Sequence, residues 1–277
     1  MTVKETLNYA RKLLNAGHID DASLEGELLL RQALGLSRAR LFSDLGHNID
    51  PEQETAFWRM VRRRLDGEPS AYIIGRREFY GLDFIVGPGV LIPRPESELL
   101  VEKTLALVIN HRTPVIADIG TGCGAIAVSL AVNLPQASIY ATDISAAALE
   151  VARANCHKHR VAERVHLLYG DMLEPLPEPA DFIVANLPYV KLSDIAARCP
   201  EPLSALDGGA GGLDKIRRLL YQIEGKLNPG GCLLLEIGLG QSEAITGLLS
   251  RLFPTATVEV ISDLAGIDRV VSMTLPN

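Results

Sequence analysis

Apolar positions in the first 67 residues recur three or four residues apart, which is the spacing of an amphipathic α-helix. The first run includes Leu7, Ala10 and Leu14, and it follows Thr2 and Glu5, whose spacing is that of a capping box. A second run, LEGELLLRQAL, stops before a glycine, and a third follows the helix-start sequence DPEQ. We therefore expect a small N-terminal domain that contains only helices.

The next segment, residues 70–95, has a different pattern. Its sequence REFYGLDFIVGPGVLIPRP places aromatic and β-branched residues between glycines and prolines, which is typical of short strands and turns. We expect a β-hairpin or two short strands here, acting as the connector between two domains.

From residue 96 to the end, helical and strand patterns alternate. The expected strands include PVIADIG, SIYATDIS, RVHLLYGDM, ADFIVANLPYV and CLLLEIG. Such alternation predicts an α/β fold with a doubly wound, mostly parallel sheet that is covered by helices on both faces. The final segments TVEVIS and RVVSMTL are joined by DLAGID alone, which is too short for a parallel crossover, so the last strand should be antiparallel. We expect three parts: a helical domain at 1–69, the hairpin connector at 70–95 and the sheet domain at 96–277.

The composition narrows the class of protein. The chain carries a net charge of −7, and the acidic excess lies after residue 80, where 22 Asp and Glu outnumber 15 Lys and Arg. This balance disfavours a protein that mainly binds nucleic acid through its phosphates. No apolar run approaches the roughly 18 residues of a membrane span, and the N-terminus lacks a signal-peptide core, so we expect a cytoplasmic protein without a membrane partner. The four cysteines lack the spacing of a zinc site, and no metal is expected.

The first strand of the sheet domain ends in the glycine-rich sequence DIGTGCG. A glycine-rich turn in this position is where doubly wound sheets bind nucleotide-like cofactors. The spacing G-x-G-x-G is one residue tighter than the G-x-G-x-x-G turn that holds a pyrophosphate. The tighter form resembles the first motif of class I S-adenosylmethionine (SAM) methyltransferases. The candidate cofactor-binding residues of this turn are Gly120, Thr121, Gly122, Cys123 and Gly124.

Acidic residues end the next two strands. Asp143 follows the second strand, 23 residues after Gly120, where a carboxylate can accept both ribose hydroxyls of either NAD or SAM. Asp171 ends the third strand and can accept a hydrogen bond from an adenine amino group, while Met172 can flank the ring. Aspartates at strand ends also form turns or cap helices, but their order and spacing relative to the glycine turn favour a cofactor site.

The fourth strand ends in the sequence NLPY, residues 186–189, which closely resembles the (N/D)PPY motif of methyltransferases that modify a planar nitrogen. The lone pair of such a nitrogen is delocalised. The site therefore needs acceptors for two N–H groups, and the side-chain oxygen of Asn186 and the backbone carbonyl of Leu187 can serve. Pro188 restricts this backbone, and Tyr189 offers a flat face to a planar group. The alternative is a strand that simply ends in a proline turn with a local Asn cap.

Over essentially its whole length, the chain resembles the bacterial release-factor glutamine methyltransferases of the HemK type. The resemblance rests on REFYGLDFIV, LIPRPESE, DIGTGCGAIA, NLPYV, EPLSALDGGAGGL and LLLEIG. It implies a SAM-binding fold and a helical N-terminal domain that docks the release factor. It also implies methylation of the side-chain amide nitrogen (N5) of the Gln in the factor's Gly-Gly-Gln motif, with S-adenosylhomocysteine as the second product.

The resemblance also implies roles for particular residues. Gly120 to Gly124, Asp143, Met172 and Asn186 would line SAM. Asn186 to Tyr189 would hold the substrate Gln, and Leu91 would add an apolar contact to it. Arg94 and Glu98 would fix the connector near the site.

Two positions depart from the family pattern. Leu187 stands where the family has a proline, and it keeps the backbone carbonyl but makes the loop less rigid. Met172 stands where some relatives have an aromatic residue, and a methionine can still cover an adenine ring. We expect activity to survive both changes.

Three other functions share features of this pattern. A glutamine methyltransferase acting on a ribosomal protein would have the same fold and the same Asn-x-Pro-Tyr loop. An adenine-N6 methyltransferase would use the loop to stack a flipped base, although the acidic balance and the lack of a basic recognition domain disfavour it. A SAM-binding adaptor without catalysis would not require the intact Asn186.

Overall fold

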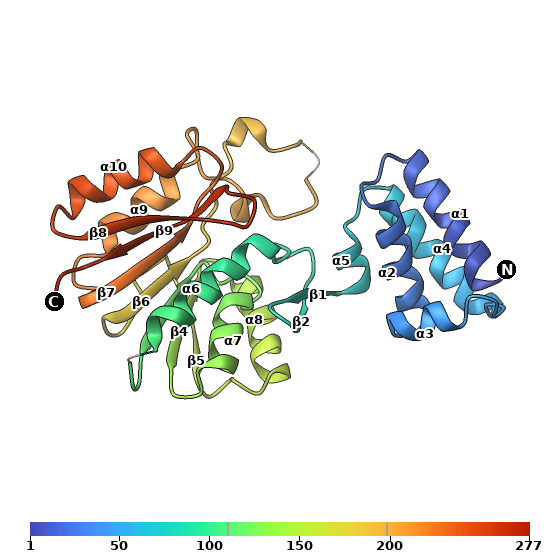
Figure 1. Ribbon diagram of the computed structural model, residues 1–277, viewed down its shortest axis with the longest axis horizontal. Helices are drawn as coiled ribbons and strands as arrows, with labels where there is room; N and C mark the ends of the chain where they lie inside the picture. The colour runs from blue at the N-terminus through green and yellow to red at the C-terminus, as the bar shows by residue number, and fades with distance from the viewer. Residues whose placement is uncertain (110, 198) are drawn as a thin grey trace. The chain divides into compact units, whose positions relative to one another are not determined.

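The computed structural model describes residues 1–109, 111–197 and 199–277. The chain divides into two compact units, Met1–Arg76 and Arg77–Asn277. Their helices and strands carry the labels of Figure 1. We describe each unit by itself.

The N-terminal unit is a bundle of helices (Figure 1). These are α1 (Val3–Ala16), α2 (Ala22–Leu34), α3 (Arg38–Ser43), α4 (Pro51–Leu65) and α5 (Ser70–Ile74). Their apolar faces meet in one core, in which Leu14, Leu29, Leu30 and Phe57 are fully buried. The buried residues of α2 and of α4 share one face of each helix because they recur at helical spacing.

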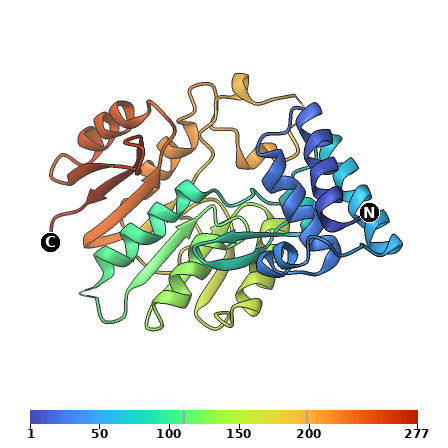
Figure 2. The same cartoon turned by 45° about the vertical axis from the view of Figure 1, so that its right-hand side comes forward.

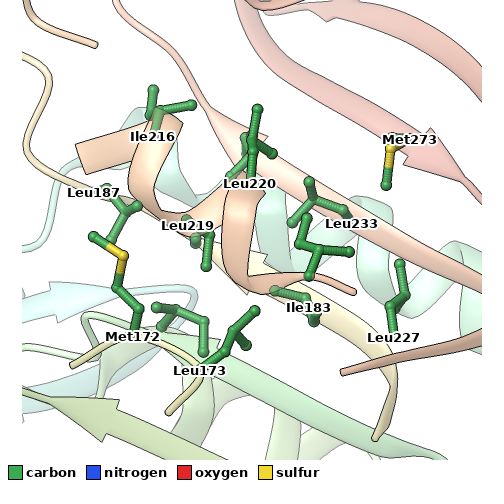
Figure 3. Packing of buried hydrophobic residues seen from close by; sticks show 14 of the residues in the cluster. Met172, Leu173, Ile183, Leu187, Ile216, Leu219, Leu220, Leu227, Leu233 and Met273 are labelled. Atoms are coloured by element: carbon green, nitrogen blue, oxygen red, sulfur yellow. The ribbon is translucent and has the colours of Figure 1, made fainter. Parts of the chain in front are cut away.

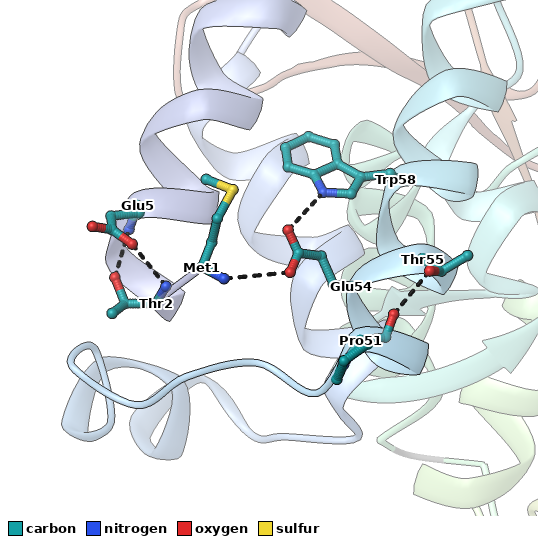
Figure 4. A network of polar contacts seen from close by, with 7 residues as sticks. All are labelled: Met1, Thr2, Glu5, Pro51, Glu54, Thr55 and Trp58. Carbon is teal, nitrogen blue, oxygen red and sulfur yellow. Dashed lines mark hydrogen bonds and ion pairs between the residues drawn. The ribbon is translucent and has the colours of Figure 1, made fainter.

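The capping box at the start of α1 is confirmed. The Glu5 N–H donates to the Thr2 hydroxyl, and the Thr2 N–H donates to the Glu5 carboxylate over 2.9 Å. Close by, the carboxylate of Glu54 accepts from the amino terminus and from the indole N–H of Trp58, each over 3.4 Å (Figure 4). These contacts tie the first residue of the chain to α4.

Two local details of this unit differ from expectation. Asp50 stands at the N-cap of α4 and Pro51 at its first position, as predicted, but among the described residues the Asp50 side chain has no capping partner. Residues Ser70–Ile74 form the short helix α5 rather than strand. Pro69 caps this helix and Gly75 ends it in the left-handed conformation, so the two helix-breaking residues act here as its boundaries.

The predicted hairpin follows directly. It consists of β1 (Arg76–Phe79) and β2 (Leu82–Ile85), which form a two-stranded sheet. Tyr80 and Gly81 connect them and both have positive φ, 50° and 70°, as a tight two-residue hairpin turn requires. The inner aromatic rings of the two strands, Phe79 and Phe84, are fully buried and meet edge to face.

The larger unit contains a seven-stranded sheet with strand order β5-β4-β3-β6-β7-β9-β8 (Figures 1 and 2). The strands are β3 (Val115–Ile119), β4 (Ser138–Asp143), β5 (Val165–Tyr169), β6 (Ala180–Ala185), β7 (Leu227–Glu236), β8 (Thr257–Ser262) and β9 (Asp268–Thr274). The pairs from β5 to β7 are parallel, and β9 is antiparallel to both of its neighbours. The predicted α/β class and the antiparallel last strand are confirmed.

Helices cover both faces of this sheet. They are α6 (Glu98–Val108), α7 (Ala125–Asn133), α8 (Ala146–Lys158), α9 (Asp214–Gln222) and α10 (Ser242–Leu252), with short 3-10 turns at Pro95–Ser97, Leu192–Asp194 and Leu203–Ala205. None of the helices in the described ranges is long and apolar enough to span a membrane.

The core beneath α9 and α10 includes both residues that depart from the family pattern, Leu187 and Met172. Leu187 is 4% exposed and belongs to the same buried cluster as Met172, Ile183, Leu219 and Leu220 (Figure 3). Its side chain therefore anchors the loop after β6 by burial, in a place where proline would restrict the backbone instead.

One predicted boundary is wrong. The segment DKIRRLLYQIEGKL was expected to be one helix, but α9 ends at Gln222 and β7 begins at Leu227. Gly225, with φ of 72°, lies in the turn between them. The left-handed conformation that glycine tolerates ends the helix early.

Strand order reverses at the centre of the sheet. The strands β4 and β5 lie on one side of β3, whereas β6 and β7 lie on the other. A crevice opens at the carboxyl ends of strands at such a switch point. The glycine turn follows β3 and the loop 186–189 follows β6, so the fold brings the two predicted motifs to adjacent strand ends.

Candidate active site

Two adjoining pockets lie at the carboxyl ends of β3 to β6. The larger is lined by strand-end residues, by residues 89–91 and by part of the segment 202–205; the smaller is lined partly by Phe79, Pro93 and Ser97. Both pockets include Leu91, Gly120, Gly122 and Asn186. Asn186 therefore stands between two spaces.

Most of the predicted residues line one of these pockets. Gly120, Gly122, Leu91, Asp143, Asp171, Met172, Asn186, Leu187 and Pro188 line the larger pocket, and Thr121 and Cys123 line the smaller. Among the described residues that form the two linings, Gly124 and Tyr189 do not appear.

The glycine turn is left-handed at all three glycines. Gly120, Gly122 and Gly124 have φ of 72°, 57° and 82°, a region that side chains rarely adopt. A Cβ at Gly124 would lie 3.2 Å from Ala152 Cβ, so this glycine allows close packing on α8. By contrast, no described atom lies within 4 Å of a Cβ built on Gly122, which leaves that backbone open to the pocket.

A buried carboxylate braces this turn from below. Asp118 is 1% exposed, and its Oδ2 accepts from the Thr121 hydroxyl over 2.7 Å and from the Ala127 N–H over 3.1 Å. Burial raises the pKa of Asp118 to about 6, although these two hydrogen bonds oppose the shift. One side chain thus ties the turn to the start of α7.

Asp143 connects the end of β4 to the turn. Its two carboxylate oxygens accept from the backbone N–H groups of Gly122, over 2.9 Å, and Ser145, over 2.8 Å. Burial raises its pKa, and the hydrogen bonds from the backbone oppose that rise. Each carboxylate oxygen can accept a further hydrogen bond, so Asp143 can still receive two hydroxyl groups from the pocket.

Asp171 is already engaged by its neighbours. Its Oδ2 accepts from Gln222 Nε2 over 3.0 Å and pairs with Arg218 over 2.7 Å. The next residue, Met172, is 8% exposed, has φ of 49°, and contributes both to the buried core and to the pocket wall. Asp171 is thereby held in place at the edge of the larger pocket, beside an apolar wall that suits a planar ring such as adenine.

The side chain of Asn186 has a fixed partner. Its Nδ2 donates to the Ser97 hydroxyl over 2.8 Å, which leaves its oxygen, Oδ1, without that partner. The loop that follows continues along the wall of the larger pocket through Leu187 and Pro188. An acceptor oxygen and a backbone bend therefore occur at the junction of the two pockets.

Tyr189 points into the protein. Its hydroxyl donates to Glu236 Oε1 over 3.1 Å, and its backbone carbonyl accepts from Gln241 Nε2 over 3.2 Å. Burial raises the pKa of Tyr189, and the carboxylate of Glu236 raises it further. In this structure Tyr189 contributes anchoring contacts, and the flat face predicted for it is outside both linings.

The segments that carry Arg94 and Glu98 are held by an ion pair and by hydrogen bonds. Arg94 forms an ion pair with Glu201, whose other oxygen accepts from the Ile92 N–H over 3.0 Å. Glu98 accepts from the Tyr80 N–H over 2.8 Å. These contacts tie the segment 89–94 to Glu201 and the hairpin to the start of α6, beside both pockets.

Sequence reasoning missed several residues of the site. Phe79 and Ile144 line the pockets, and Ser97 fixes Asn186. The partly buried Glu201 and the buried Glu236 anchor neighbouring segments. The only available signal was an acidic residue at the end of the strand CLLLEIG, where a charge is unusual. The partners of these residues are distant in the chain, so no local pattern identifies them.

Comparison with known proteins defines the class first. Residues 95–201 match the family model described as methyltransferase small domain, and residues 5–75 match the PrmC N-terminal domain. A methyltransferase from Pyrococcus furiosus shares the fold, with a TM-score of 0.54 at 21% identity over 72% of this chain and 91% of that one. The protein is a methyltransferase with an additional helical domain.

Full-length relatives then identify the family. The release factor glutamine methyltransferase of Moorella thermoacetica is 44% identical, covering 97% of each chain. That of Geobacter sulfurreducens is 40% identical, covering 98% of this chain and 95% of its own. The chain belongs to the release factor glutamine methyltransferase family, which confirms the family predicted from the sequence motifs.

Proposed function

We propose that the protein transfers the methyl group of SAM to the side-chain amide nitrogen of the Gln in the Gly-Gly-Gln motif of peptide chain release factors. The observation that supports this most is the position of Asn186 between two pockets, with its amide oriented by Ser97. The relatives are release factor glutamine methyltransferases, and we take the substrate from them.

The larger pocket fits SAM. The open left-handed backbone at Gly122 leaves room for a ligand to approach closely, and the Asp143 carboxylate can accept the two ribose hydroxyls. Met172 and Ile144 offer apolar surface for the adenine ring. Asp171 is fixed by Arg218 and retains a second oxygen for the adenine amino group. When bound, SAM supplies an electrophilic methyl group on a sulfonium.

The chain's own part in the reaction is to hold a poor nucleophile. Asn186 Oδ1 and the Leu187 carbonyl accept the two N–H groups of the amide, and this turns the nitrogen lone pair toward the methyl group. Positioning of this kind can supply most of a rate enhancement. The neutral nitrogen becomes strongly acidic once methylated, so it releases a proton without a strong base. The smaller pocket, with Phe79 and Leu91, is the proposed site of the glutamine side chain.

The remaining parts of the chain have proposed roles as well. Residues 1–69 would dock the release factor, residues 70–95 would connect the domains, and residues 96–277 would carry out methyl transfer. We place this activity in the cytoplasm, where release factors act. A ribosomal-protein glutamine would fit the same site, whereas the net charge of −7 disfavours a nucleic-acid substrate.

Incubation with methyl-labelled SAM and a purified release factor tests this proposal. We expect one methyl group per factor, located by mass spectrometry on the Gly-Gly-Gln glutamine, and none on a factor in which that Gln is replaced by Ala. Ribosomal proteins and total RNA serve as competing substrates. Label in either of these, with none in the release factor, would contradict the proposal.

A further inference from the structure

A line of polar groups lies behind Asn186. Asn186 contacts Ser97, which is 4% exposed, and Tyr189 contacts Glu236, which is 2% exposed. The Ser97 hydroxyl lowers the pKa of Glu236, which relates the two pairs to each other. These residues come from three separate places in the chain: the 3-10 turn before α6, the end of β7 and the loop after β6. Burying a carboxyl group costs free energy unless it is hydrogen-bonded, so its partners here have to be accounted for.

The protons in this line can be counted. Asn186 Nδ2 donates to the Ser97 hydroxyl, and the Tyr189 hydroxyl donates to Glu236 Oε1. Glu236 Oε2 is buried and has no hydrogen-bond partner among the described residues, so it is an acceptor that still needs a donor. The Ser97 hydroxyl has one proton, which an interaction with Asn186 Nδ2 does not use. The Ser97 hydroxyl lowers the pKa of Glu236, which is the effect expected of a donor to that carboxylate, although burial raises this pKa overall.

We propose that Ser97 and the ionised carboxylate of Glu236 are positioning residues that determine which way the Asn186 amide faces. A carboxylate can only accept, so it takes the single proton of Ser97. The Ser97 oxygen can then only accept from Asn186, which must present Nδ2 to it. Asn186 Oδ1 is thereby directed to the substrate amide. This inference rests on the proposed function, in which Oδ1 is an acceptor for the substrate N–H.

Protonation of Glu236 would remove this control. A neutral carboxyl can donate to Ser97, whose own proton is then free to point at Asn186, and the amide has no preferred orientation. Burial raises the pKa of Glu236, as does the nearby Glu96, while Ser97, Tyr189 and Arg269 lower it. Because the pKa is raised, the loss of kcat on acidification should begin at a higher pH than an ordinary glutamate would give.

A purely structural role makes different predictions. If Ser97 and Glu236 only stabilised the fold, their removal would lower the melting temperature without changing kcat in the folded enzyme. It would also leave the shape of the pH profile unchanged. A role in orienting Asn186 instead affects kcat, spares SAM binding, and depends on the hydroxyl at position 97.

The test compares four variants with the wild type at saturating release factor and SAM. Ser97→Ala should lower kcat at least about tenfold, since misplaced groups at an active site can cost that much or more, while the Kd for SAM changes less than about threefold. Ser97→Thr keeps a hydroxyl and should recover most of the lost kcat. Ser129→Ala is the matched control and should leave kcat unchanged, because it removes the hydroxyl of a buried serine in α7 for which the described part of the chain offers no hydrogen-bond partner.

Glu236→Gln provides the independent readout. The glutamine side chain at position 236 cannot ionise and can both donate and accept. We therefore expect kcat to fall, and the further decrease of kcat at acidic pH to disappear from the pH profile. A Ser97→Ala enzyme with unchanged kcat, a Ser97→Thr enzyme as slow as Ser97→Ala, or a Glu236→Gln enzyme with the wild-type decrease of kcat at acidic pH would each overturn the inference. If the wild type itself leaves the release factor unmethylated, the proposed function fails instead, so the two failures are distinguishable.

Discussion

The glycine turn at 120–124 and the loop at 186–189 end adjacent strands, but the two are held in different ways. The turn is shaped by its own backbone: three left-handed glycines, with one N–H directed to Asp143 and one nearby carboxylate, Asp118, beneath it. The loop is held by side chains from elsewhere, since Ser97, Glu236 and Gln241 each contact it. A turn shaped by its own backbone suits a cofactor of constant shape. A loop held by side chains from elsewhere allows those side chains to control the orientation of one amide.

This difference predicts separable effects of mutation. Changes in the turn should act mainly on SAM binding, and changes in the loop mainly on turnover. Four substitutions test the separation.

The largest effect should come from Asn186→Ala. It removes the acceptor oxygen at the junction of the pockets, and loss of a single preorganised hydrogen-bonding group commonly costs about 100-fold or more in kcat. The glycine turn and Asp143 remain, so the Kd for SAM, measured by calorimetry, should change less than about threefold. Turnover within a few fold of the wild type would show that Asn186 does not have this role.

Asp143→Ala should act in the opposite way. It deletes the proposed acceptor of two ribose hydroxyls, and hydrogen bonds to a charged group contribute about 1.5 kcal/mol each, so the Kd for SAM should rise about 100-fold. The same titration on Asp20→Ala, an exposed position in the N-terminal unit, is the control. An unchanged affinity for Asp143→Ala would refute the assignment.

Gly122→Ala separates backbone strain from contact with the cofactor. Gly122 and Gly35 have similar φ, 57° and 66°, and neither has a described atom within 4 Å of a built Cβ. Alanine at either position should lower the free energy of unfolding by about 1 kcal/mol. Only at Gly122 should the methyl group enter the pocket and weaken SAM binding, by about tenfold. Equal SAM affinities in the two variants would place the cofactor elsewhere.

Leu187→Pro should have the smallest effect. Proline keeps the backbone carbonyl that is the proposed second acceptor, and the wild-type side chain acts through burial in the core. We expect kcat within about threefold of the wild type and a loss of about 1–2 kcal/mol in stability from the smaller buried side chain. A loss of kcat comparable to that of Asn186→Ala would mean that the Leu187 side chain, and not its carbonyl, is needed.

The same contrast explains what could be predicted from the sequence. The alternation of strands and helices gave the sheet and its antiparallel last strand, because periodicity and connection length are local properties. The glycine turn could be located because its conformation demands glycine. Helix α5 and the early end of α9 were missed, since Pro69 and Gly225 determine boundaries that apolar periodicity does not mark.

The support of the loop could not be predicted for a physical reason. Ser97 and Glu236 lie 89 and about 50 residues from Asn186 along the chain, and their contacts exist only once the sheet has formed. A buried serine and a buried glutamate have no characteristic spacing. Their role follows from counting donors and acceptors in three dimensions.

A crystal structure of the protein with S-adenosylhomocysteine and a Gly-Gly-Gln peptide is the most direct test of the central claim. We expect the amide nitrogen of the peptide glutamine to lie about 3 Å from Asn186 Oδ1, with Nδ2 still on Ser97 and the nitrogen facing the cofactor sulfur. A glutamine bound away from Asn186, or Asn186 Oδ1 turned toward Ser97, would contradict it.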